Sequence, residues 1–446
     1  MDFKLMRQAM RDRWRWRNTR SQLARVTIVS QFFPPDFAAT GQFIDQISRG
    51  LAARGIQNLV LSGQPGYAFH SDRADRIEFH PNRCIRRTSL SRFWPQRIRG
   101  RVVNSLLFSL RTFLRLLRQA RRGDLLLFST EPAYLPVIGW FTRLLTRAPY
   151  VLLLYDIYPD IAVSLGVVSR SHPLVRLWFL LQERALDSAE EVIVLSSSMA
   201  EHLRSHYPEI ATPISVLPSW ADPQWIQPLP KAENWFVQRH SLQNIFIVLY
   251  SGNQGRCHDL TTLLDAASLL QDEQRIRVLI VGSGAQHDQL VSRVNQESLG
   301  NVMFLPYQDA NALPTLLAAA DLAVVSLLAS AEGQVAPSKL YGHLAAGSAV
   351  ALICSPHSYL RDELERGRFG AAFGTGQAKE LALFIRQLAE DPVRCQQLGQ
   401  AARQHLLATA TPDIVLEAYA DLLSRHLPLG EKSYASPLPQ TSPKFT

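Results

Sequence analysis

One segment in the second half of the chain carries the residues best suited to chemistry. It reads SAEGQVAPSKLYGHLAAG, in which Glu332 and Gly333 follow an apolar run and Ser338 and Lys339 follow Pro337, a residue that can begin a helix. A helix start has free backbone N–H groups, and the added hydroxyl and ammonium suit an anionic leaving group. The Glu332 carboxylate is suited to accept hydrogen bonds from sugar hydroxyls. Lysine in a first helical turn opposes the helix dipole, which favours a ligand over chance placement.

Two glycine-bearing loops in the same half are weaker phosphate candidates. The stretch YSGNQGRCHD places Arg256 on a turn before a helix, where its planar guanidinium suits a diphosphate. A solvated surface arginine is the alternative, since the chain has 41 arginines. The stretch VGSG, with Gly282 and Gly284, predicts a strand followed by a tight turn, and a lone GxG is weak evidence of function.

The first half offers one loop and one carboxylate. In SQFFPPDFAATGQF, Thr40 and Gly41 open an amphipathic helix, and a phosphate site and an ordinary turn explain this segment equally well. In LLLYDIYPDIAVSLG, Asp156 stands directly after an apolar strand, from which it could reach a hydroxyl in a cleft. A helix N-cap is the commoner role for aspartate at such a place and is favoured by this segment alone.

Short apolar runs alternate with longer amphipathic stretches, which predicts two successive doubly wound α/β domains. The runs are rich in Val, Ile and Leu on both faces, as in strands covered by helices on either side. Ligands in such folds bind at the carboxyl ends of the strands. The predicted strands are Val26–Ser30, Leu59–Leu61, Leu125–Ser129, Val151–Leu154, Val192–Leu195, Ile214–Leu217, Phe246–Tyr250, Val278–Val281, Val302–Leu305, Leu322–Ser326, Val350–Ile353 and Ala371–Phe373.

A connection rich in proline separates the two predicted domains. Pro218, Pro223, Pro228 and Pro230 fall within thirteen residues, a density that excludes a helix or an inner strand. The chain has 446 residues, which also fits two large domains. Its four cysteines have no CxxC spacing, so we expect neither a disulfide framework nor a structural zinc site.

Taken together, five segments resemble a bacterial GT-B glycosyltransferase of family four, a group of retaining, metal-independent enzymes. The segments are FFPPDFAATGQF, LLLYDIYPDIAVSLG, SGNQGRCHDLTTLLDAA, VGSGAQHDQL and EGQVAPSKLYGHLAAG, in that order between about Arg25 and Leu427. The likeness is nearest to members that assemble O-antigen, colanic acid or other exopolysaccharide. It implies two Rossmann-like domains facing a central cleft, with a nucleotide-sugar donor, UDP-linked, on the second domain and the acceptor on the first.

The resemblance also implies domain limits. Residues 1–24 form a basic N-terminal extension, 25–222 the acceptor-side domain and 223–405 the nucleotide-sugar-binding domain. Residues 406–430 form a C-terminal helix that could return to the first domain, and 431–446 a disordered tail.

Roles carry over to single positions. Gly41 matches the small-residue loop that approaches the donor phosphates, and Asp156 the polar position that faces the acceptor. Arg256 matches the basic residue of the diphosphate loop, with His258 as a nearby substitute, and Glu332 the first of the family's paired glutamates. The catalytic candidates are therefore Asp156 and Glu332. The donor-binding candidates are Gly41, Arg256, His258, Gly282, Gly284, Gly333, Ser338 and Lys339.

The second glutamate of that pair is missing. Eight residues after Glu332 the chain has Leu340, and alignment back from Gly347 gives Gly342, where similar members carry glutamate. The carboxylate expected to hold the ribose hydroxyls is thus absent. Either another group replaces it or donor affinity and nucleotide preference change, and an inactive enzyme is a third possibility.

The resemblance implies a reaction without a protein nucleophile, a metal or another cofactor. The leaving diphosphate takes the acceptor proton on the same face, while basic groups and helix N-termini stabilise its charge. The sequence agrees, since it has no evident catalytic triad and no DxD pair. His202 and His206 have a metal-ligand spacing, but no third ligand follows them, so a solvated helix face is the preferred interpretation.

Charge is concentrated in the first 150 residues, which hold 26 basic and 9 acidic residues. Within them, residues 97–122 have eight arginines and no acid beside the stripe Val103, Leu106, Leu107, Leu110, Phe113, Leu114 and Leu117. Such a helix can lie on an anionic membrane, although the stripe itself is expected to face the core. Trp14 and Trp16 in the basic arm could also sit at a membrane interface.

With no apolar spanning segment or signal-type h-region visible, we expect a cytoplasmic protein, peripheral on the inner face of the cytoplasmic membrane, acting on a polyprenyl-diphosphate-linked or saccharide acceptor.

Two other functions stay open. A non-hydrolysing UDP-N-acetyl-sugar epimerase shares the two-domain architecture, but it needs several acid/base groups and only Asp156 is convincing. A non-catalytic anion- or nucleic-acid-binding protein would use the basic first half, yet no binding module for nucleic acid is evident and no nucleic acid is expected.

Overall fold

The computed structural model describes residues 25–36, 38–65, 74–88, 98–120 and 123–427. The predicted basic arm with Trp14 and Trp16, and the predicted tail at 431–446, lie outside these residues. All twelve predicted strands are present within a residue or two, in two parallel-rich sheets, so the predicted α/β fold class is confirmed. The chain divides into two compact units: one holds the residues up to Leu153, 184–192 and those from Leu416 on, and the other holds 154–183 and 193–415.

The first sheet has eight strands in the order β3-β4-β2-β1-β5-β6-β7-β8. Their bounds are β1 Arg25–Val29, β2 Asn58–Ser62, β3 Ile77–His80, β4 Arg83–Arg87, β5 Asp124–Ser129, β6 Tyr150–Leu154, β7 Glu191–Val194 and β8 Ile214–Val216. The pairs from β4 through β6 are parallel, whereas β3 is antiparallel to β4. Every residue of β1, β2, β5 and β6 is buried, which explains why these strands lack polar alternation.

The helices that follow these strands are α2 Ala39–Ala53, α3 Ile98–Gln119, α4 Leu135–Thr146, α5 Asp160–Ser164, α6 Pro173–Asp187 and α7 Ser197–His206. Ser196 caps α7 by accepting a hydrogen bond from the Met199 amide at 3.3 Å. The helix predicted at residues 406–430 is instead the end of α15, Pro392–Thr409, and a separate helix α16, Pro412–His426. Within the first unit, α16 packs on α2, where a Cβ at Gly50 would lie 3.2 Å from Leu416. His426 Nε2 also lies 2.5 Å from a Glu191 carboxylate oxygen.

The second sheet has six parallel strands in the order β11-β10-β9-β12-β13-β14. Their bounds are β9 Phe246–Ser251, β10 Ile276–Val281, β11 Val302–Leu305, β12 Leu322–Ser326, β13 Ala349–Ile353 and β14 Gly370–Phe373. Residues 217–234, which contain the four clustered prolines, form neither helix nor strand.

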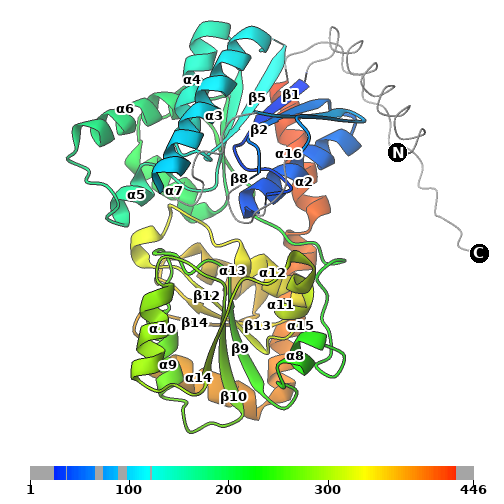
Figure 1. Cartoon of the computed structure of the whole chain (residues 1–446), viewed down its shortest axis with the longest axis vertical. Helices are drawn as coiled ribbons and strands as arrows, with labels where there is room; N and C mark the ends of the chain where they lie inside the picture. Colours follow the sequence, from blue (N-terminus) through cyan, green and yellow to red (C-terminus); the bar gives the residue numbers. More distant parts are fainter. Residues whose placement is uncertain (1–24, 37, 66–73, 89–97, 121–122, 428–446) are drawn as a thin grey trace, which may run out of the picture. The chain divides into compact units, whose positions relative to one another are not determined.

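Helices cover both faces of this second sheet (Figure 1). Alternate side chains of its strands point to opposite faces and form two separate apolar clusters. One face packs on α9 Thr261–Ser268, α10 His287–Gln296 and α14 Ala378–Glu390. The other packs on α8 Trp235–Arg239, α11 Leu313–Leu317, α12 Lys339–Ala346, α13 Tyr359–Gly367 and α15. In β9, for example, Ile247 and Leu249 face the second group and Val248 and Tyr250 the first. Burial on both faces fixes the strand ends, and therefore the loops that follow them.

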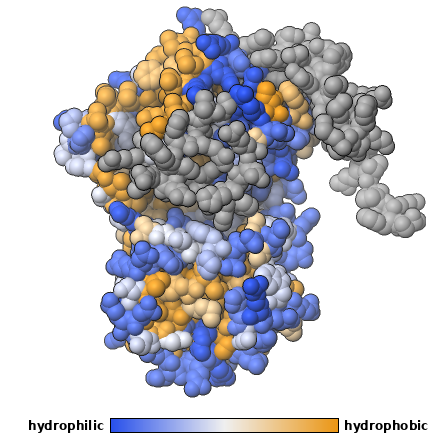
Figure 2. Space-filling view, viewed as in Figure 1, coloured by the Kyte–Doolittle hydropathy of each residue, from blue (hydrophilic) through white to orange (hydrophobic). Residues whose placement is uncertain are grey.

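Two expectations need correction. The sequence did not indicate β3 and β4, because both are short and the second reads RCIRR. The apolar stripe of α3 was expected to face the core, but Val103, Leu106, Leu110 and Leu114 are exposed, and Phe108, Thr112 and Leu116 are buried instead. Exposed apolar side chains on the neighbouring α4 extend this surface, namely Phe141, Leu144 and Leu145. Figure 2 shows hydrophobic surface where Figure 1 places α3 and α4.

Candidate active site

Glu332 stands on a turn that follows β12. A short 3-10 helix, Ala329–Ala331, precedes it, and Gly333 follows with a φ of 71°. A Cβ at Gly333 would lie 2.9 Å from the Ser198 carbonyl oxygen and 3.0 Å from the His202 Cβ. Both the left-handed backbone and the close approach therefore require glycine here. Gly333 thus lets the turn that carries Glu332 lie directly against α7, and its role in donor binding stays a prediction.

The Glu332 carboxylate is buried without a well-formed hydrogen bond. Neither of its oxygens is exposed or paired among the described residues. Burial raises the pKa of this carboxyl, and nearby hydroxyls of Ser358 and Ser198 and amides of Tyr359 and Gly333 oppose the shift. The Ser198 hydroxyl accepts a hydrogen bond from the Tyr359 amide at 3.1 Å. A buried carboxylate in this state can accept hydrogen bonds from a ligand that brings hydroxyl donors.

Lys339, the first residue of α12, lies in a network with Tyr250 and His258. Its Nζ donates to the Tyr250 hydroxyl at 2.6 Å, and that hydroxyl donates to the Asn253 carbonyl at 2.7 Å. His258 Nδ1 donates to the Ser326 carbonyl at 2.7 Å, which leaves Nε2 as an acceptor 3.3 Å from Lys339 Nζ. The ammonium thus uses two of its three N–H groups, and among the described residues no carboxylate lies within ion-pair distance of it.

Burial dominates the electrostatics of this network. It lowers the pKa of Lys339 to about 7, with a small opposing effect from Cys257. It also lowers the pKa of His258 to about 3, to which the charge of Lys339 contributes. His258 is therefore a neutral imidazole that accepts from Lys339, and the ammonium is the only cationic group of the three. A buried ammonium without a counterion is stabilised by any anion that enters the site.

Asp156 belongs to the same unit as Glu332 and Lys339. It pairs with Val335 in an isolated antiparallel bridge, and the Ile157 amide donates to the Gln334 carbonyl at 2.8 Å. The bridge holds Asp156 beside the segment between Glu332 and Lys339. Burial raises the pKa of Asp156 to about 6. The nearby Cys257 thiol has a raised pKa, mainly through burial, and interacts electrostatically with both Lys339 and Asp156.

The glycine loops after β9 and β10 are interlocked. The Gly252 amide donates to the Val281 carbonyl and the Gln254 amide to the Ser283 carbonyl, each at 2.9 Å. Gly282 has a φ of 128°, and a Cβ there would lie 2.2 Å from the Gly252 oxygen. A Cβ at Gly284 would lie 2.5 Å from the Gln254 carbonyl. These glycines are required for the two loops to touch.

Other predicted donor-binding residues lie around these loops. Gly252 approaches the Lys339 side chain, since a Cβ there would be 3.6 Å from its Cε. Arg256 is exposed on the turn before α9 and forms no ion pair among the described residues. Ser338 precedes α12 with an αR backbone, and its side chain caps no amide there. The helix begins at Lys339, two residues later than expected from Pro337.

Gly342, which replaces the expected glutamate, lies in the middle of α12. A Cβ at this position would lie 3.0 Å from the Leu317 Cδ1. A glutamate here would require Leu317 on α11 to move, so the packing of α11 on α12 is matched to glycine. The next residue, His343, is fully buried with neither ring nitrogen paired, and burial lowers its pKa to about 3.

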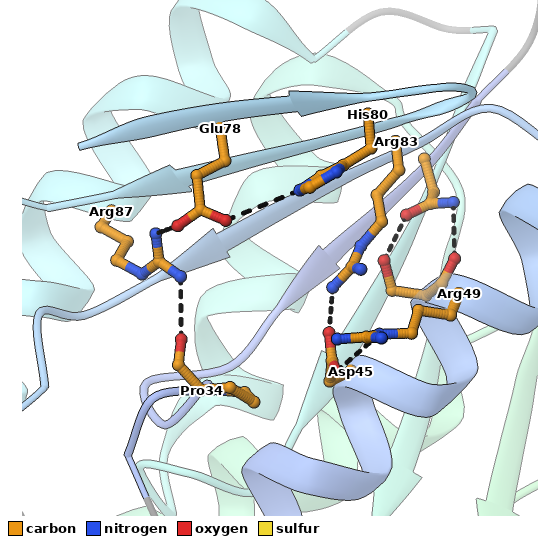
Figure 3. Close-up of polar contacts among 9 residues, drawn as sticks. Pro34, Asp45, Arg49, Glu78, His80, Arg83 and Arg87 are labelled. Carbon is orange, nitrogen blue, oxygen red and sulfur yellow. Dashed lines mark hydrogen bonds and ion pairs between the residues drawn. The ribbon is translucent and has the colours of Figure 1, made fainter. Parts of the chain in front are cut away.

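Gly41 lies on α2 in the first unit. A Cβ at Gly41 would lie 3.0 Å from the Phe32 carbonyl carbon and the Phe33 amide nitrogen, so glycine allows α2 to touch the loop after β1. A cluster of charged residues supports the same loop (Figure 3). Arg87 on β4 donates to the Pro34 carbonyl at 2.8 Å and pairs with Glu78.

The rest of this cluster surrounds a pocket of about 430 Å³. Arg83 pairs with Asp45 on α2 (Figure 3). Its guanidinium lies 5.5 Å from the Phe33 ring centre. Because Arg83 and Arg87 each already have a carboxylate partner, the cluster primarily ties the β3–β4 hairpin to α2 and to the loop. The basic character of β4 was the available sequence signal for it, but a buried arginine strand was not expected.

Sequence reasoning also missed the residues that support the second-unit site. Tyr250 was expected only as a strand residue, and no role was expected for Ser198, Cys257 or His343. Their roles depend on contacts between distant segments, such as the 89 residues that separate Tyr250 from Lys339. A tyrosine at the end of a buried parallel strand, just before a glycine loop, was the one usable signal.

Two Rossmann-like sheets with these loops at their strand ends define a GT-B glycosyltransferase. Residues 39–220 match the family model described as glycosyl transferase 4-like domain, and residues 232–405 match glycosyl transferases group 1. The two matches together span most of the chain, and the predicted enzyme class, a glycosyltransferase, and the predicted fold are confirmed.

Known proteins similar to this chain share most of its length at low identity. The probable glycosyltransferase WbjE of Pseudomonas aeruginosa is 24% identical over 407 residues, 89% of this chain and 97% of that protein. The putative colanic acid biosynthesis glycosyl transferase WcaI of Escherichia coli K12 is 25% identical, over 75% of this chain and 84% of that protein. The structure of Anabaena Alr3699/HepE in complex with UDP-glucose covers 90% of this chain and 99% of that one, with a TM-score of 0.64 and 17% identity.

Proposed function

We propose that the protein transfers a sugar, with retention, from a UDP-linked donor to a lipid-linked or saccharide acceptor in the synthesis of a cell-surface polysaccharide. The observation that carries the proposal is the half-buried Lys339 ammonium, which has a free N–H and no carboxylate partner among the described residues. A nucleoside diphosphate supplies the missing anion. The UDP-glucose complex of HepE supports the donor, and the colanic acid role named for WcaI supports the product class.

In this proposal the second unit binds the donor. Lys339 and the backbone amides of the interlocked loops after β9 and β10 bind the diphosphate, with Arg256 at the exposed edge. Glu332 accepts hydrogen bonds from sugar hydroxyls, which satisfies its unpaired oxygens.

The chemical step needs no protein nucleophile. The bond from the anomeric carbon to the diphosphate oxygen breaks, and the diphosphate keeps the electron pair. The acceptor hydroxyl attacks the same face and gives its proton to the departing diphosphate. Lys339 stabilises the charge that grows on that diphosphate, which is electrostatic catalysis in a site shielded from water. Asp156, a carboxylate above pH 6, is assigned to the acceptor hydroxyl.

Glycine at position 342 has a consequence for donor binding. Without a carboxylate on that turn of α12, the ribose hydroxyls have one charged acceptor fewer. A hydrogen bond to a charged group contributes about 1.5–3 kcal/mol. We therefore infer weaker selection of the ribose than in members with the paired glutamates, and transfer that depends more on the diphosphate and the sugar.

The same proposal includes an anionic membrane surface as partner. None of the helices in the described part of the chain is long and apolar enough to span a bilayer. The surface of α3 and α4 offers exposed Leu106, Leu110 and Leu145, with Arg111, Arg115 and Arg143 on the same two helices. Apolar side chains beside arginine fit the boundary between anionic headgroups and acyl chains. Such binding brings a lipid-linked acceptor to the first unit.

The test of transfer uses purified protein, bacterial membranes and a panel of nucleotide sugars. Wild type should give a lipid-linked product from one donor, Glu332→Ala should give none, and Glu380→Ala, an exposed control on α14, should match wild type. Equal transfer by Glu332→Ala would refute the donor role. Turnover of a UDP-sugar without any acceptor would indicate an epimerase instead.

The membrane partner is tested separately by co-sedimentation with vesicles. The double variant Leu106→Asp/Leu110→Asp should bind anionic vesicles at least tenfold more weakly than wild type. Leu269→Asp is the matched control, because Leu269 is 49% exposed against 53% for Leu106 and 54% for Leu110. Equal binding by the double variant, or equal binding of wild type to neutral vesicles, would refute this part of the proposal.

A further inference from the structure

Three side chains from two helices form a cluster outside the donor-binding residues. Asp160 opens α5, and His202 and His206 lie one turn apart near the end of α7. One ligand atom from each, a carboxylate oxygen and two imidazole nitrogens, lies within 4.8 Å of the others. The third ligand that the spacing of the histidines lacked is thus supplied by Asp160, 42 residues earlier in the chain than His202.

We propose that Asp160, His202 and His206 bind a divalent transition-metal ion, Zn²⁺ by the chemistry of the set. Two imidazoles and one carboxylate are ligands typical of zinc, and three protein ligands leave a fourth position for water. Tetrahedral bonds of about 2.0–2.1 Å place neighbouring ligand atoms roughly 3.3 Å apart. Asp160 Oδ1 and His202 Nε2 already lie 3.2 Å apart.

Hydrogen bonds orient both His206 and Asp160, as is usual for metal ligands. His206 Nδ1 lies 3.2 Å from the His202 carbonyl oxygen, to which it donates, so that Nε2 carries the free lone pair. Donation from the other ring nitrogen to a backbone carbonyl is the usual arrangement of a metal-binding histidine. The second oxygen of Asp160 accepts a hydrogen bond from the Tyr207 hydroxyl at 2.7 Å, which fixes the carboxylate.

Burial divides the cluster into a fixed part and an adjustable part. The side chains of Asp160 and His202 are 5% and 10% exposed, whereas His206 is exposed. The two imidazole rings are stacked, with centroids 3.9 Å apart. Because His206 is exposed and the Asp160–His202 pair is buried, His206 is the ligand with room to adjust to a bound ion.

The position of the cluster connects it to the donor-binding turn. His202 touches Gly333, where a Cβ would lie 3.0 Å from the His202 Cβ. An ion that joins α5 to α7 fixes His202, and through it the turn that carries Glu332. This metal site does not depend on the proposed donor or acceptor, and it replaces the expectation from sequence that no metal binds.

The test is a titration of the metal-free full chain with Zn²⁺ against a chromophoric chelator. Wild type should bind one equivalent that His206→Ala binds at least tenfold more weakly. His206 is exposed, so its removal leaves the buried Asp160–His202 pair in place. His172→Ala is the control, because His172 is also exposed but lies before α6. It should bind Zn²⁺ like wild type.

Thermal unfolding provides a second measurement. Zn²⁺ should raise the melting temperature of wild type and of His172→Ala, but not that of His206→Ala, since only a site in the folded state stabilises it. Equal affinity and equal thermal shift in wild type and His206→Ala would overturn the proposal. The proposal would also fail if wild type had no Zn²⁺ site with a higher affinity than the sites that remain in His206→Ala.

Discussion

The buried Lys339 makes nucleotide binding depend on pH in a way that can be calculated. With a pKa of about 7, the ammonium is half protonated at pH 7 and about one hundredth protonated at pH 9. A bound diphosphate is anionic and restores the pKa toward the ordinary value of a lysine. If UDP requires the ammonium, its affinity should fall roughly fifty-fold between pH 7 and pH 9, which is about 2.3 kcal/mol. The sign follows because the free site loses its proton over this range while the complex keeps it.

Isothermal titration calorimetry measures both the affinity and the proton. At pH 7, in buffers with different ionisation enthalpies, binding of UDP should take up about half a proton. UDP suits this range because its terminal phosphate, with a second pKa near 6, is already ionised at pH 7.

The matched variant is Lys339→Met, which keeps most of the length of the side chain and removes the charge. It should bind UDP weakly and with an affinity that does not change between pH 7 and pH 9. If the variant retained the slope of wild type, another group would be responsible. If wild type bound equally well at both pH values, the reasoning about Lys339 would be refuted.

Three further predictions concern stability. Gly282→Ala should lower the free energy of unfolding, measured by urea denaturation, by at least about 2 kcal/mol. The reason is that Gly282 has a positive φ and that the added Cβ would lie 2.2 Å from the Gly252 carbonyl oxygen. Gly300→Ala is the control and should leave the free energy of unfolding unchanged, because a Cβ there meets nothing within 4 Å. The Asp156 carboxyl has a folded pKa of about 6, above its unfolded value, so it contributes stability at low pH that is lost as pH rises. Asp156→Asn has no such loss, and its stability relative to wild type should therefore increase by roughly 2 kcal/mol between pH 4 and pH 7. A difference in melting temperature that stays constant over this range would contradict the prediction. Arg403→Met should destabilise by roughly 3 kcal/mol, because its guanidinium donates to the carbonyls of Pro223, Ile226 and Ala345; unchanged thermal unfolding would contradict that.

The sequence predicted the buried strands because their pattern is strong. Runs such as Leu125–Ser129 and Val350–Ile353 are apolar on both faces, and only a sheet covered on both sides uses such strands. The sequence did not predict β3 and β4, because β4 reads RCIRR and is mostly arginine. The charges of Arg83 and Arg87 are neutralised by carboxylates from α2 and β3. Those partners cannot be seen from the strand itself.

The α3 stripe shows a different limit. Periodicity identified the helix but not which of its faces meets the sheet. The buried face has Asn104, Ser109 and Thr112 beside Phe108 and Leu116, so it is less apolar than the exposed one. A helix whose more apolar side is exposed cannot be oriented from hydropathy alone.

The candidate site was predicted in its types of residue and not in its contacts. Motif position was enough to single out Glu332, Lys339 and His258. It was not enough to find that Asp156 pairs with Val335, or that Asp160 completes the set with His202 and His206. Such contacts depend on how loops from distant strands fold against one another, which local patterns do not encode.

The placement of α16 has a consequence for biosynthesis. Residues from Leu416 on group with the first unit, where α16 rests on α2 at Gly50 and His426 meets Glu191. During translation the first unit therefore stays incomplete, with the Gly50 side of α2 uncovered, until α16 has been synthesised. A nascent chain that stalls or is cleaved before α16 leaves this side of α2 exposed, and we expect such a chain to be recognised by chaperones and proteases.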